Sequence, residues 1–323
     1  MYTIRRIFNP EIYQGKHKRN NYFEGWYYKI IDRNSENILA IIPGVAINNA
    51  NKHSFIQFID AKTGFTSFIT YPIGEFSYSE TELNIRIDKS RFTGRIMQIC
   101  LQSPNLRVDG TVEFANSVTF PKSLINPGIM GPYSFIPFME CHHGIINIHS
   151  ELKGGIHYNG KYIDFTDGYG YLEKDWGKSF PHSWIWLQSN NFSHSNTSIM
   201  FSIASIPWFH REFDGLISFL KLDDTFLRFA TYTGARIKEL KVNDQALAVM
   251  IQDSKYKLYI EAEYSKGGIL KAPKKGIMEV DITESITSVV KVRLCEKSGK
   301  VLYDGVGENT GLELAGNYKK FVI

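Results

Sequence analysis

The sequence has few cysteines, no concentrated charge and no long apolar run, and each shortage excludes a class of protein. Its three cysteines, Cys100, Cys141 and Cys295, lack CxxC spacing, which argues against a zinc site or a disulfide framework. The 37 basic and 33 acidic residues form no basic block, so we expect no nucleic-acid partner. No window approaches the ~20 apolar residues of a membrane span. We expect a cytoplasmic protein with at most peripheral membrane contact.

Motifs for common cofactors are also missing. The sequence contains no GxGxxG, no P-loop and no nucleophile elbow, which argues against nucleotide use and acyl-enzyme chemistry. The run Cys141-His142-His143, with His149, is a weak metal signal, because adjacent residues on a strand point to opposite faces and no HExxH accompanies them. We therefore expect neither a metal ion nor another cofactor.

Aromatic residues on short alternating segments are abundant instead. Phe, Tyr and Trp make up 14% of the 323 residues, a bias typical of strands and apolar cavities. Residues 83–87 and 290–294 alternate apolar with polar or charged side chains, as strands with one core face do. Two-residue hairpin turns are predicted at Asn159-Gly160 and at Asp223-Asp224. Because no apolar stripe of helical period persists, we predict an all-β chain.

An internal repetition predicts how the strands are grouped. Residues 23–28 (FEGWYY) lead into residues 37–43 (NILAIIP), and residues 180–186 (FPHSWIW) lead into residues 196–202 (NTSIMFS). Two copies of an aromatic opening strand followed by hairpins favour two antiparallel barrels in tandem, because closure removes exposed sheet edges. We predict one barrel in residues 1–175 and a second in residues 176–323.

The most informative stretch is residues 169–190, which combines tryptophans, tyrosines and carboxylates. If its first half is extended, Tyr171, Glu173 and Asp175 share one face of a strand. Aromatic rings beside ionisable carboxyls suit a cavity that holds an apolar ligand and moves a proton on it.

Three motifs resemble the tocopherol cyclase family, including its bacterial members of unassigned role. They are residues 23–28 (FEGWYY), residues 138–142 (FMECH) and residues 171–190 (YLEKDWGKSFPHSWIWLQSN). The resemblance implies a double lipocalin-like β-barrel, in agreement with the tandem barrels predicted from the alternation. Plant members of the family have Glu-Lys-Asn where this chain has Glu-Lys-Asp at residues 173–175.

The resemblance also implies a reaction, the closing of a chromanol ring on a prenylated quinol. A proton adds to the nearest double bond of the prenyl tail, and the phenol oxygen attacks the tertiary cation that forms. Such an isomerase needs a buried carboxylic acid that keeps its proton, aromatic faces along the cation, and exclusion of water. The alternative is a carrier on the same scaffold that binds a lipid or terpenoid without catalysis.

The first candidate for the acid is Glu24. It shares a strand face with Trp26 and Tyr28 if residues 23–28 are extended, so its carboxyl could face a cavity. The alternative is an ion pair that closes a barrel end, because paired charges are the commoner fate of acidic residues.

Two further pairs of side chains are candidates. Glu140 and His142 suit an acid with its hydrogen-bond partner, although a buried, satisfied histidine is the competing explanation. Glu173 and Asp175 lie close enough on one face for like charges to raise one pKa, although a salt-bridged turn with the neighbouring lysines would explain them equally well.

Residues 126–138 are apolar but contain three prolines, so they cannot form a regular central strand and are expected to cover something apolar. We predict that this segment and the aromatic strands line a pocket for a hydrophobic small molecule, namely a prenylated quinol, an isoprenoid or a lipid. The predicted substrate-binding residues are Trp26, Tyr28, Tyr133, Phe135, Phe138, Tyr171, Trp184 and Trp186.

Overall fold

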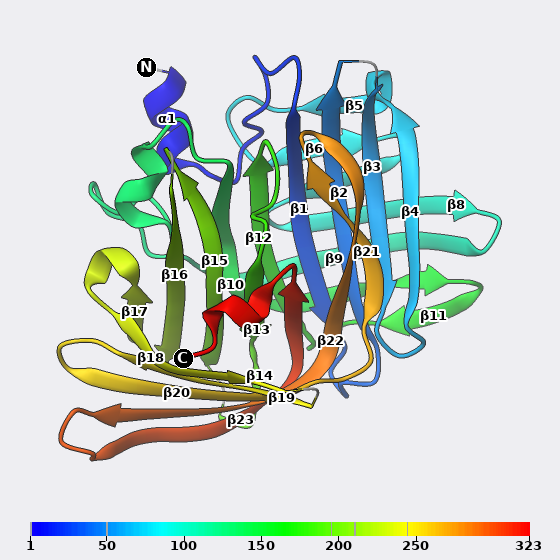
Figure 1. Cartoon of the computed structure of the whole chain (residues 1–323). Coiled ribbons are helices and arrows are strands. Elements are labelled where there is room, and N and C mark those ends of the chain that lie inside the picture. Colours follow the sequence, from blue (N-terminus) through cyan, green and yellow to red (C-terminus); the bar gives the residue numbers. More distant parts are fainter. Residues whose placement is uncertain (1, 50, 195, 210, 244) are drawn as a thin grey trace. The chain divides into compact units, whose positions relative to one another are not determined.

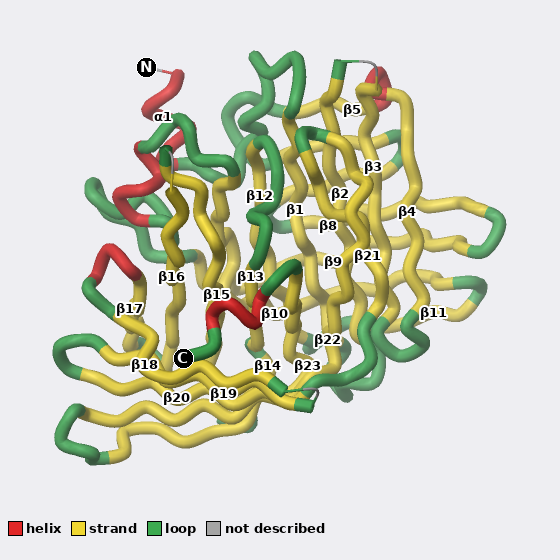
Figure 2. The backbone as a smooth tube through the Cα atoms, in the orientation of Figure 1, coloured by secondary structure: helices red, strands yellow, loops and turns green. Residues whose placement is uncertain are grey.

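The protein is built almost entirely from strands, and the predicted all-β fold is confirmed (Figure 2). The computed structural model describes residues 2–49, 51–194, 196–209, 211–243 and 245–323. In these described residues, helical structure is confined to one α-helix and four short 3-10 turns. They are α1 (Tyr2–Phe8), η1 (Ile73–Glu75), η2 (Gly131–Phe135), η3 (Thr231–Thr233) and η4 (Tyr318–Phe321). No helix there is long and apolar enough to cross a membrane.

The first sheet has the order β4-β3-β2-β1-β12-β10-β9-β8-β7-β6-β5, with β11 added beside β10. Figure 1 shows its strands in blue to green. The strands are β1 (Tyr22–Ile31), β2 (Ile38–Asn48), β3 (Asn51–Asp60), β4 (Phe65–Pro72), β5 (Phe76–Tyr78), β6 (Asn84–Ile87), β7 (Ser90–Thr93), β8 (Ile96–Ser103), β9 (Leu106–Thr119), β10 (Cys141–Tyr158), β11 (Lys161–Asp164) and β12 (Tyr169–Gly177).

The second sheet has the order β17-β16-β15-β13-β23-β22-β20-β19-β18, with β14 beside β23 and β21 beside β22. The strands are β13 (Trp184–Ser189), β14 (Asn191–Phe192), β15 (Thr197–Trp208), β16 (Arg211–Leu222), β17 (Thr225–Ala230), β18 (Arg236–Val242), β19 (Ala246–Gln252), β20 (Tyr256–Glu263), β21 (Gly268–Lys274), β22 (Ile277–Glu296) and β23 (Val301–Ala315).

Both sheets follow the same path. In the first sheet, β1 lies between β2 and β12, which is the last strand of that sheet in the sequence. In the second sheet, β13 lies in the same way between β15 and the last strand, β23. Strands β1 and β13 therefore hold equivalent places. The two edges of each sheet are consecutive strands, β4 and β5 joined by η1, and β17 and β18 joined by η3. Such sheets are nearly closed barrels. The repeated aromatic strand in the sequence corresponds to this repeated topology.

The chain divides into two compact units. The first comprises residues 1–180 together with residues 270–281, and the second comprises residues 181–269 and 282–323. The tip of the β21–β22 hairpin therefore belongs to the first unit. There the side-chain amide of Gln57 hydrogen bonds to both the N–H and the carbonyl of Lys271, at 2.8 and 3.1 Å.

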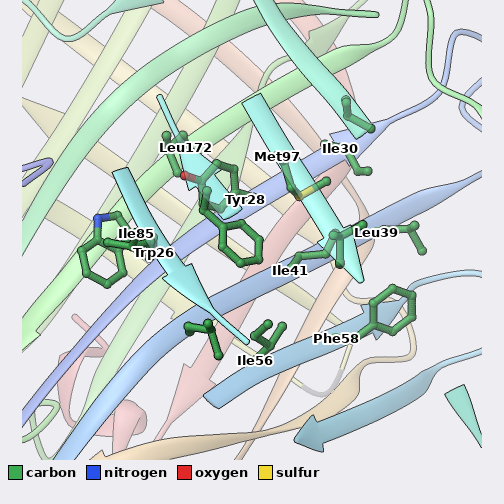
Figure 3. Close-up of a cluster of buried hydrophobic side chains, with 14 of the residues drawn as sticks. Trp26, Tyr28, Ile30, Leu39, Ile41, Ile56, Phe58, Ile85, Met97 and Leu172 are labelled. Atoms are coloured by element: carbon green, nitrogen blue, oxygen red, sulfur yellow. The ribbon is translucent and has the colours of Figure 1, made fainter. Parts of the chain in front are cut away.

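Each sheet encloses its own apolar core, because alternate side chains of its strands point inward. The core of the first sheet includes Trp26, Tyr28 and Phe58, which Figure 3 shows among aliphatic side chains of neighbouring strands. The second core is built around residues such as Phe201 and Leu220.

The predicted hairpins are present. Asn159 and Gly160, with φ of 47° and 85°, connect β10 to β11, and Asp223, with φ of 47°, begins the turn between β16 and β17. Positive φ at these positions matches the turn type that a twisted two-stranded hairpin favours. The proline-containing residues 126–138 form turns and η2 rather than a strand, as predicted.

Candidate active site

Strand β12 carries ionisable side chains on both of its faces. It lies between β1 and β10 in the first sheet. Leu172 and Trp176 pack with the core of that sheet, and Lys174, which alternates with them, lies on the same side. Glu173 and Asp175 point to the opposite side, as the sequence predicts.

On the face opposite the core, His143 lies between two carboxyl groups. Its Nδ1 is 2.9 Å from Asp175 Oδ1, and its Nε2 is 3.4 Å from Glu173 Oε2. The arrangement follows from the strand register, because His143 on β10 is directly opposite Asp175 on β12. The Tyr171 hydroxyl donates a 2.6 Å hydrogen bond to Glu173. With side-chain exposures of 13% for His143 and 25% for Asp175, this group is shielded but not sealed.

The charge on His143 is set by these neighbours. Burial lowers the pKa of its imidazole, but Asp175 and Glu173 raise it, and the net effect places the pKa well above 6.5. Burial and Glu173 likewise raise the pKa of Tyr171 well above 10, which keeps its hydroxyl a donor. At neutral pH the group therefore holds an imidazolium, which is a proton stored beside a carboxyl.

Among the residues that the structure describes, His143, Glu173 and Asp175 form a group that could hold a metal ion, since their ligand atoms lie within 4.8 Å of one another. However, the two carboxyl groups meet different ring nitrogens of His143. One ion can bind only one nitrogen of a ring. The contact of Nδ1 with Asp175 is a hydrogen bond, whereas Nε2 lies within ion-pair range of Glu173, at 3.4 Å, but makes no hydrogen bond to it.

On the core side of β12, Lys174 forms a completely buried ion pair with Glu24. Lys174 Nζ is 2.5 Å from Glu24 Oε1, and both side chains have 0% exposure. The backbone N–H of Gln14 donates to both oxygens of Glu24, at 2.8 and 2.9 Å, and the Tyr22 hydroxyl donates at 2.5 Å. Glu24 is thus surrounded by donors, which favours the ion-pair alternative for this residue.

The ammonium group of Lys174 also has a full set of partners. Its Nζ donates to the carbonyl oxygens of Pro10 and Ile12, at 2.8 and 2.6 Å. It also lies 4.7 Å from the ring centroid of Trp26 and 4.8 Å from that of Trp176, within range of cation–π attraction. Burial lowers the pKa of Lys174 to about 8, against the opposing effect of its carboxylate partner. The pair anchors residues 10–14 to β1 and β12.

The structure gives His142 a partner other than Glu140. Glu140 precedes β10 and lies outside the strand, so strand alternation does not apply to it. The His142 ring stacks on Trp176, with centroids 5.2 Å apart and planes 9° apart. Burial and two nearby lysines lower the pKa of His142 to about 4. The role of Glu140 as an acid, with His142 as its hydrogen-bond partner, stays a prediction.

The predicted substrate-binding aromatics of the first unit lie in three settings, one of which is that of Tyr171, buried beside Glu173 on the face of β12 opposite the core. Trp26 and Tyr28 are completely buried in the core, where each donates a hydrogen bond to a backbone carbonyl. Tyr133 and Phe135 lie on η2, and Phe138 follows it; Phe135 and Phe138 are 42% and 55% exposed. Their roles in binding stay predictions.

In the second unit, Trp184 and Trp186 share one face of β13, as predicted, while the residues that alternate with them join the core. Both tryptophans are buried. Trp184 Nε1 donates a 2.6 Å hydrogen bond to Glu313. The ring of Trp186 lies against Gly311, where an added Cβ would be 2.7 Å from it.

The sequence-based prediction of site residues omits His143 and Lys174. The signal for His143 is the His-His pair itself, because one of two adjacent residues on a strand must face each side of the sheet. The signal for Lys174 is its place between two residues that alternate with it, Leu172 and Trp176, both apolar and both on the core side.

Comparison with known proteins gives the family. A model of the tocopherol cyclase-like family matches residues 75–316. Two plant proteins match more locally: "Probable tocopherol cyclase, chloroplastic" of Oryza sativa subsp. japonica is 34% identical over 68 residues, and "Tocopherol cyclase, chloroplastic" of Zea mays is 32% identical over 68 residues. Each match covers 21% of this chain and only 14% of the plant protein.

Solved structures share the fold over nearly the whole chain. CghA has a TM-score of 0.57 at 8% identity, with 92% of this chain and 89% of CghA covered. The structure of CghA with Sch210972 has a TM-score of 0.55, again at 8% identity, with 91% and 89% covered. A putative AttH from Nitrosomonas europaea has a TM-score of 0.50 at 12% identity, with 91% and 92% covered. These likenesses confirm the tandem lipocalin-like barrels.

Proposed function

The chain belongs to the tocopherol cyclase-like family, and on this basis we propose that it binds a prenylated, ring-bearing small molecule and closes a ring on it by acid catalysis. The observation that carries the proposal is the position of His143 between Glu173 and Asp175 on the opposite side of β12 from the core. Two of these residues belong to the stretch that resembles the family.

In the proposed reaction, the proton stored by His143 and Glu173 is delivered to the double bond of the prenyl tail nearest the quinol. The alkene carbon gains a C–H bond, and its neighbour becomes a tertiary cation. The phenol oxygen attacks this cation to form the C–O bond of a chromanol, and the phenol proton returns to the carboxyl–imidazole group. Protons balance over the cycle, so no cofactor is consumed.

The surrounding residues have distinct roles in this proposal. Glu173 receives the Nε2 proton of the His143 imidazolium and passes it to the alkene, and Asp175 orients the imidazole through Nδ1, 2.9 Å away. Tyr171 donates to Glu173 and thereby fixes the direction of its carboxyl. Low exposure of Glu173, 5% for its side chain, favours transfer to an organic ligand over exchange with water.

The test is to incubate a panel of prenylated quinols with the 323-residue protein in D₂O and follow chromanols by chromatography and mass spectrometry. Wild type is expected to form product with one deuterium at the carbon that was protonated. Glu173→Gln should bind the quinol but form no product, because the amide keeps the size of the side chain and cannot deliver a proton. Glu113→Gln, at an exposed position of β9, is the matched control and should remain active.

The outcomes separate the candidates. Binding of quinols by wild type without any turnover would favour the carrier. Turnover that is unchanged in Glu173→Gln would remove the proposed proton source, and the absence of both binding and turnover would overturn the ligand class. Mass spectrometry of apolar extracts of the purified protein gives an independent reading, because a co-purifying quinol, isoprenoid or fatty acid identifies the class of ligand directly.

A further inference from the structure

Gly25 lies inside β1 without the usual structural reasons for a glycine in a strand. Its φ lies outside the left-handed region, and the pairing of β1 with β12 continues past it without a bulge. An added Cβ would meet only Ile42 Cγ2, at 3.6 Å, and the Pro43 carbonyl oxygen, at 3.9 Å, which are ordinary van der Waals contacts. A glycine in a strand that neither bends nor packs tightly marks a place where a ligand can approach the backbone closely.

The glycine on the neighbouring strand shows the contrast. Gly44 on β2 is directly opposite Gly25, but an added Cβ there would be 2.4 Å from the Phe55 ring. The ring therefore occupies the space over Gly44, and packing alone explains that glycine. Over Gly25 the nearest described atom would be 3.6 Å away, so a side chain would fit and none is present.

This open space lies beside the acidic side chains of the candidate site. Asp175 is directly opposite Gly25, so its side chain leaves the sheet on the same side as the open space. Asp175 has a side-chain exposure of 25%, and Gly25 is the only residue of β1, all of which the structure describes, that is not buried. The next pair on this face, Tyr27 and Glu173, is buried. Solvent therefore reaches the sheet in a gap over Gly25.

The gap has a polar border and an apolar border. Asp175 lies on its β12 side, and the partly exposed Ile42 lies on its β2 side. The Tyr27 side chain leaves β1 on the same face as the gap and is paired with Glu173. An alkene over Gly25 would therefore have a carboxyl beside it as the acid and an aromatic ring beside the cation that forms.

We propose that the gap over Gly25 holds the prenyl tail of the substrate, with its methyl-branched double bond beside Glu173. The absence of a side chain at position 25 makes room for the methyl branch, so Gly25 determines which tails are accepted. This inference rests on the proposed function, because it assigns the place of the reacting double bond. Its test measures binding and does not require turnover.

The test compares two ligands by isothermal titration calorimetry with the 323-residue protein: a quinol with a short prenyl tail, and the analogue that lacks one methyl at the reacting double bond. Gly25→Ala should bind the prenylated quinol roughly tenfold more weakly than wild type does, or worse, because the new methyl takes the place of the ligand's methyl. The same variant should bind the analogue about as well as wild type does. Gly74→Ala changes an exposed glycine whose added Cβ meets no described atom, and as the matched control it should bind both ligands as wild type does.

Three results would overturn the inference: no binding of the prenylated quinol by wild type, equal binding by wild type and Gly25→Ala, or a loss in Gly25→Ala that is equal for both ligands. Failure of the proposed reaction has a different signature. If Gly25→Ala discriminates between the ligands as expected but wild type forms no chromanol, the place of the tail stands and only the chemistry is refuted. Thermal unfolding verifies that Gly25→Ala is folded, and it should be no less stable than wild type, since glycine is the weaker residue inside a strand.

Discussion

Replacement of Glu24 by Gln should destabilise the first unit far more than the loss of one hydrogen bond would. Gln keeps the shape of the side chain and one oxygen for the Gln14 N–H, but it leaves Lys174 charged in a site with 0% exposure. Removal of one partner from a buried ion pair typically costs about 3–5 kcal/mol, because the other charge loses both water and its counterion.

The magnitude can be apportioned with a double-mutant cycle. Lys174→Met alone leaves the Glu24 carboxylate without its counterion and removes the donor to the Pro10 and Ile12 carbonyls, so we expect a loss of similar size, about 3–5 kcal/mol. In Glu24→Gln/Lys174→Met no unpaired charge remains. The double variant should be no less stable than Lys174→Met, so the two single losses together should exceed the double loss by at least about 3 kcal/mol.

The pH dependence has a definite sign. In wild type, Glu24 opposes the effect of burial that lowers the pKa of Lys174 to about 8; in Glu24→Gln this support is gone, so the pKa falls further. Above the folded-state pKa, the folded chain binds fewer protons at Lys174 than the unfolded chain does, so stability increases with pH. The deficit of the variant should therefore be largest below its own, lowered Lys174 pKa, and should narrow between that pKa and about 8, above which Lys174 is neutral in both folded proteins.

Urea denaturation supplies the free energies, and hydrogen exchange of peptides that contain Gln14 supplies a local reading, because this N–H is bound by both oxygens of Glu24. The hydrogen-exchange measurement is needed because a chain with two compact units need not unfold in one step, so urea denaturation alone does not report on the first unit. Additive single effects, a Glu24→Gln loss below about 1 kcal/mol, or a deficit independent of pH would refute the reasoning.

Three further predictions concern other parts of the chain. Asp175→Asn removes the carboxylate nearest Nδ1 of His143, so the pKa of His143 should fall. The alkaline limit of the proposed activity should then move to lower pH. An unchanged pH–rate profile would exclude His143 as the stored acid. Gly311→Ala crowds the Trp186 ring and should cost about 1–3 kcal/mol, with an altered near-UV circular dichroism spectrum; no change in either would mean that the ring moves aside freely. In Gly160→Ala the added Cβ meets no other atom, but the backbone φ of 85° is unfavourable for alanine. We expect a lower thermal unfolding temperature, equivalent to about 1–2 kcal/mol, from backbone strain alone. An unchanged unfolding temperature would mean that the turn relaxes.

The parts of the fold that the sequence predicts are those coded by neighbouring residues. Strand alternation and turn residues are local, so the hairpin at Asn159-Gly160 and the two-faced β12 can be inferred directly. The association of Gln57 with Lys271 joins residues far apart in the sequence through one side-chain amide, and no periodic pattern announces it. Residues 270–281 could not be assigned to the first unit for that reason.

The candidate site was only half predictable for a related reason. Alternation places Glu173 and Asp175 on one face, but their partner depends on the register between β10 and β12. That register shifts between Ile145 and Asn147, so it cannot be counted from the turns. The anchor of Lys174 depends on the backbone carbonyls of residues 10 and 12, and backbone groups leave no trace in the side-chain pattern.

The two faces of β12 are mechanically linked, because alternate residues of one strand share a backbone. Lys174 fixes the strand from the core side through Glu24, and Glu173 and Asp175 are displayed by the same backbone on the other side. A proton donor must be held to within a fraction of an ångström, and a rigid support is what provides this precision. Loosening the Glu24–Lys174 pair should therefore disturb the contacts of His143 on the opposite face of β12, and in the proposed reaction the buried pair would serve as a support for the proton donor.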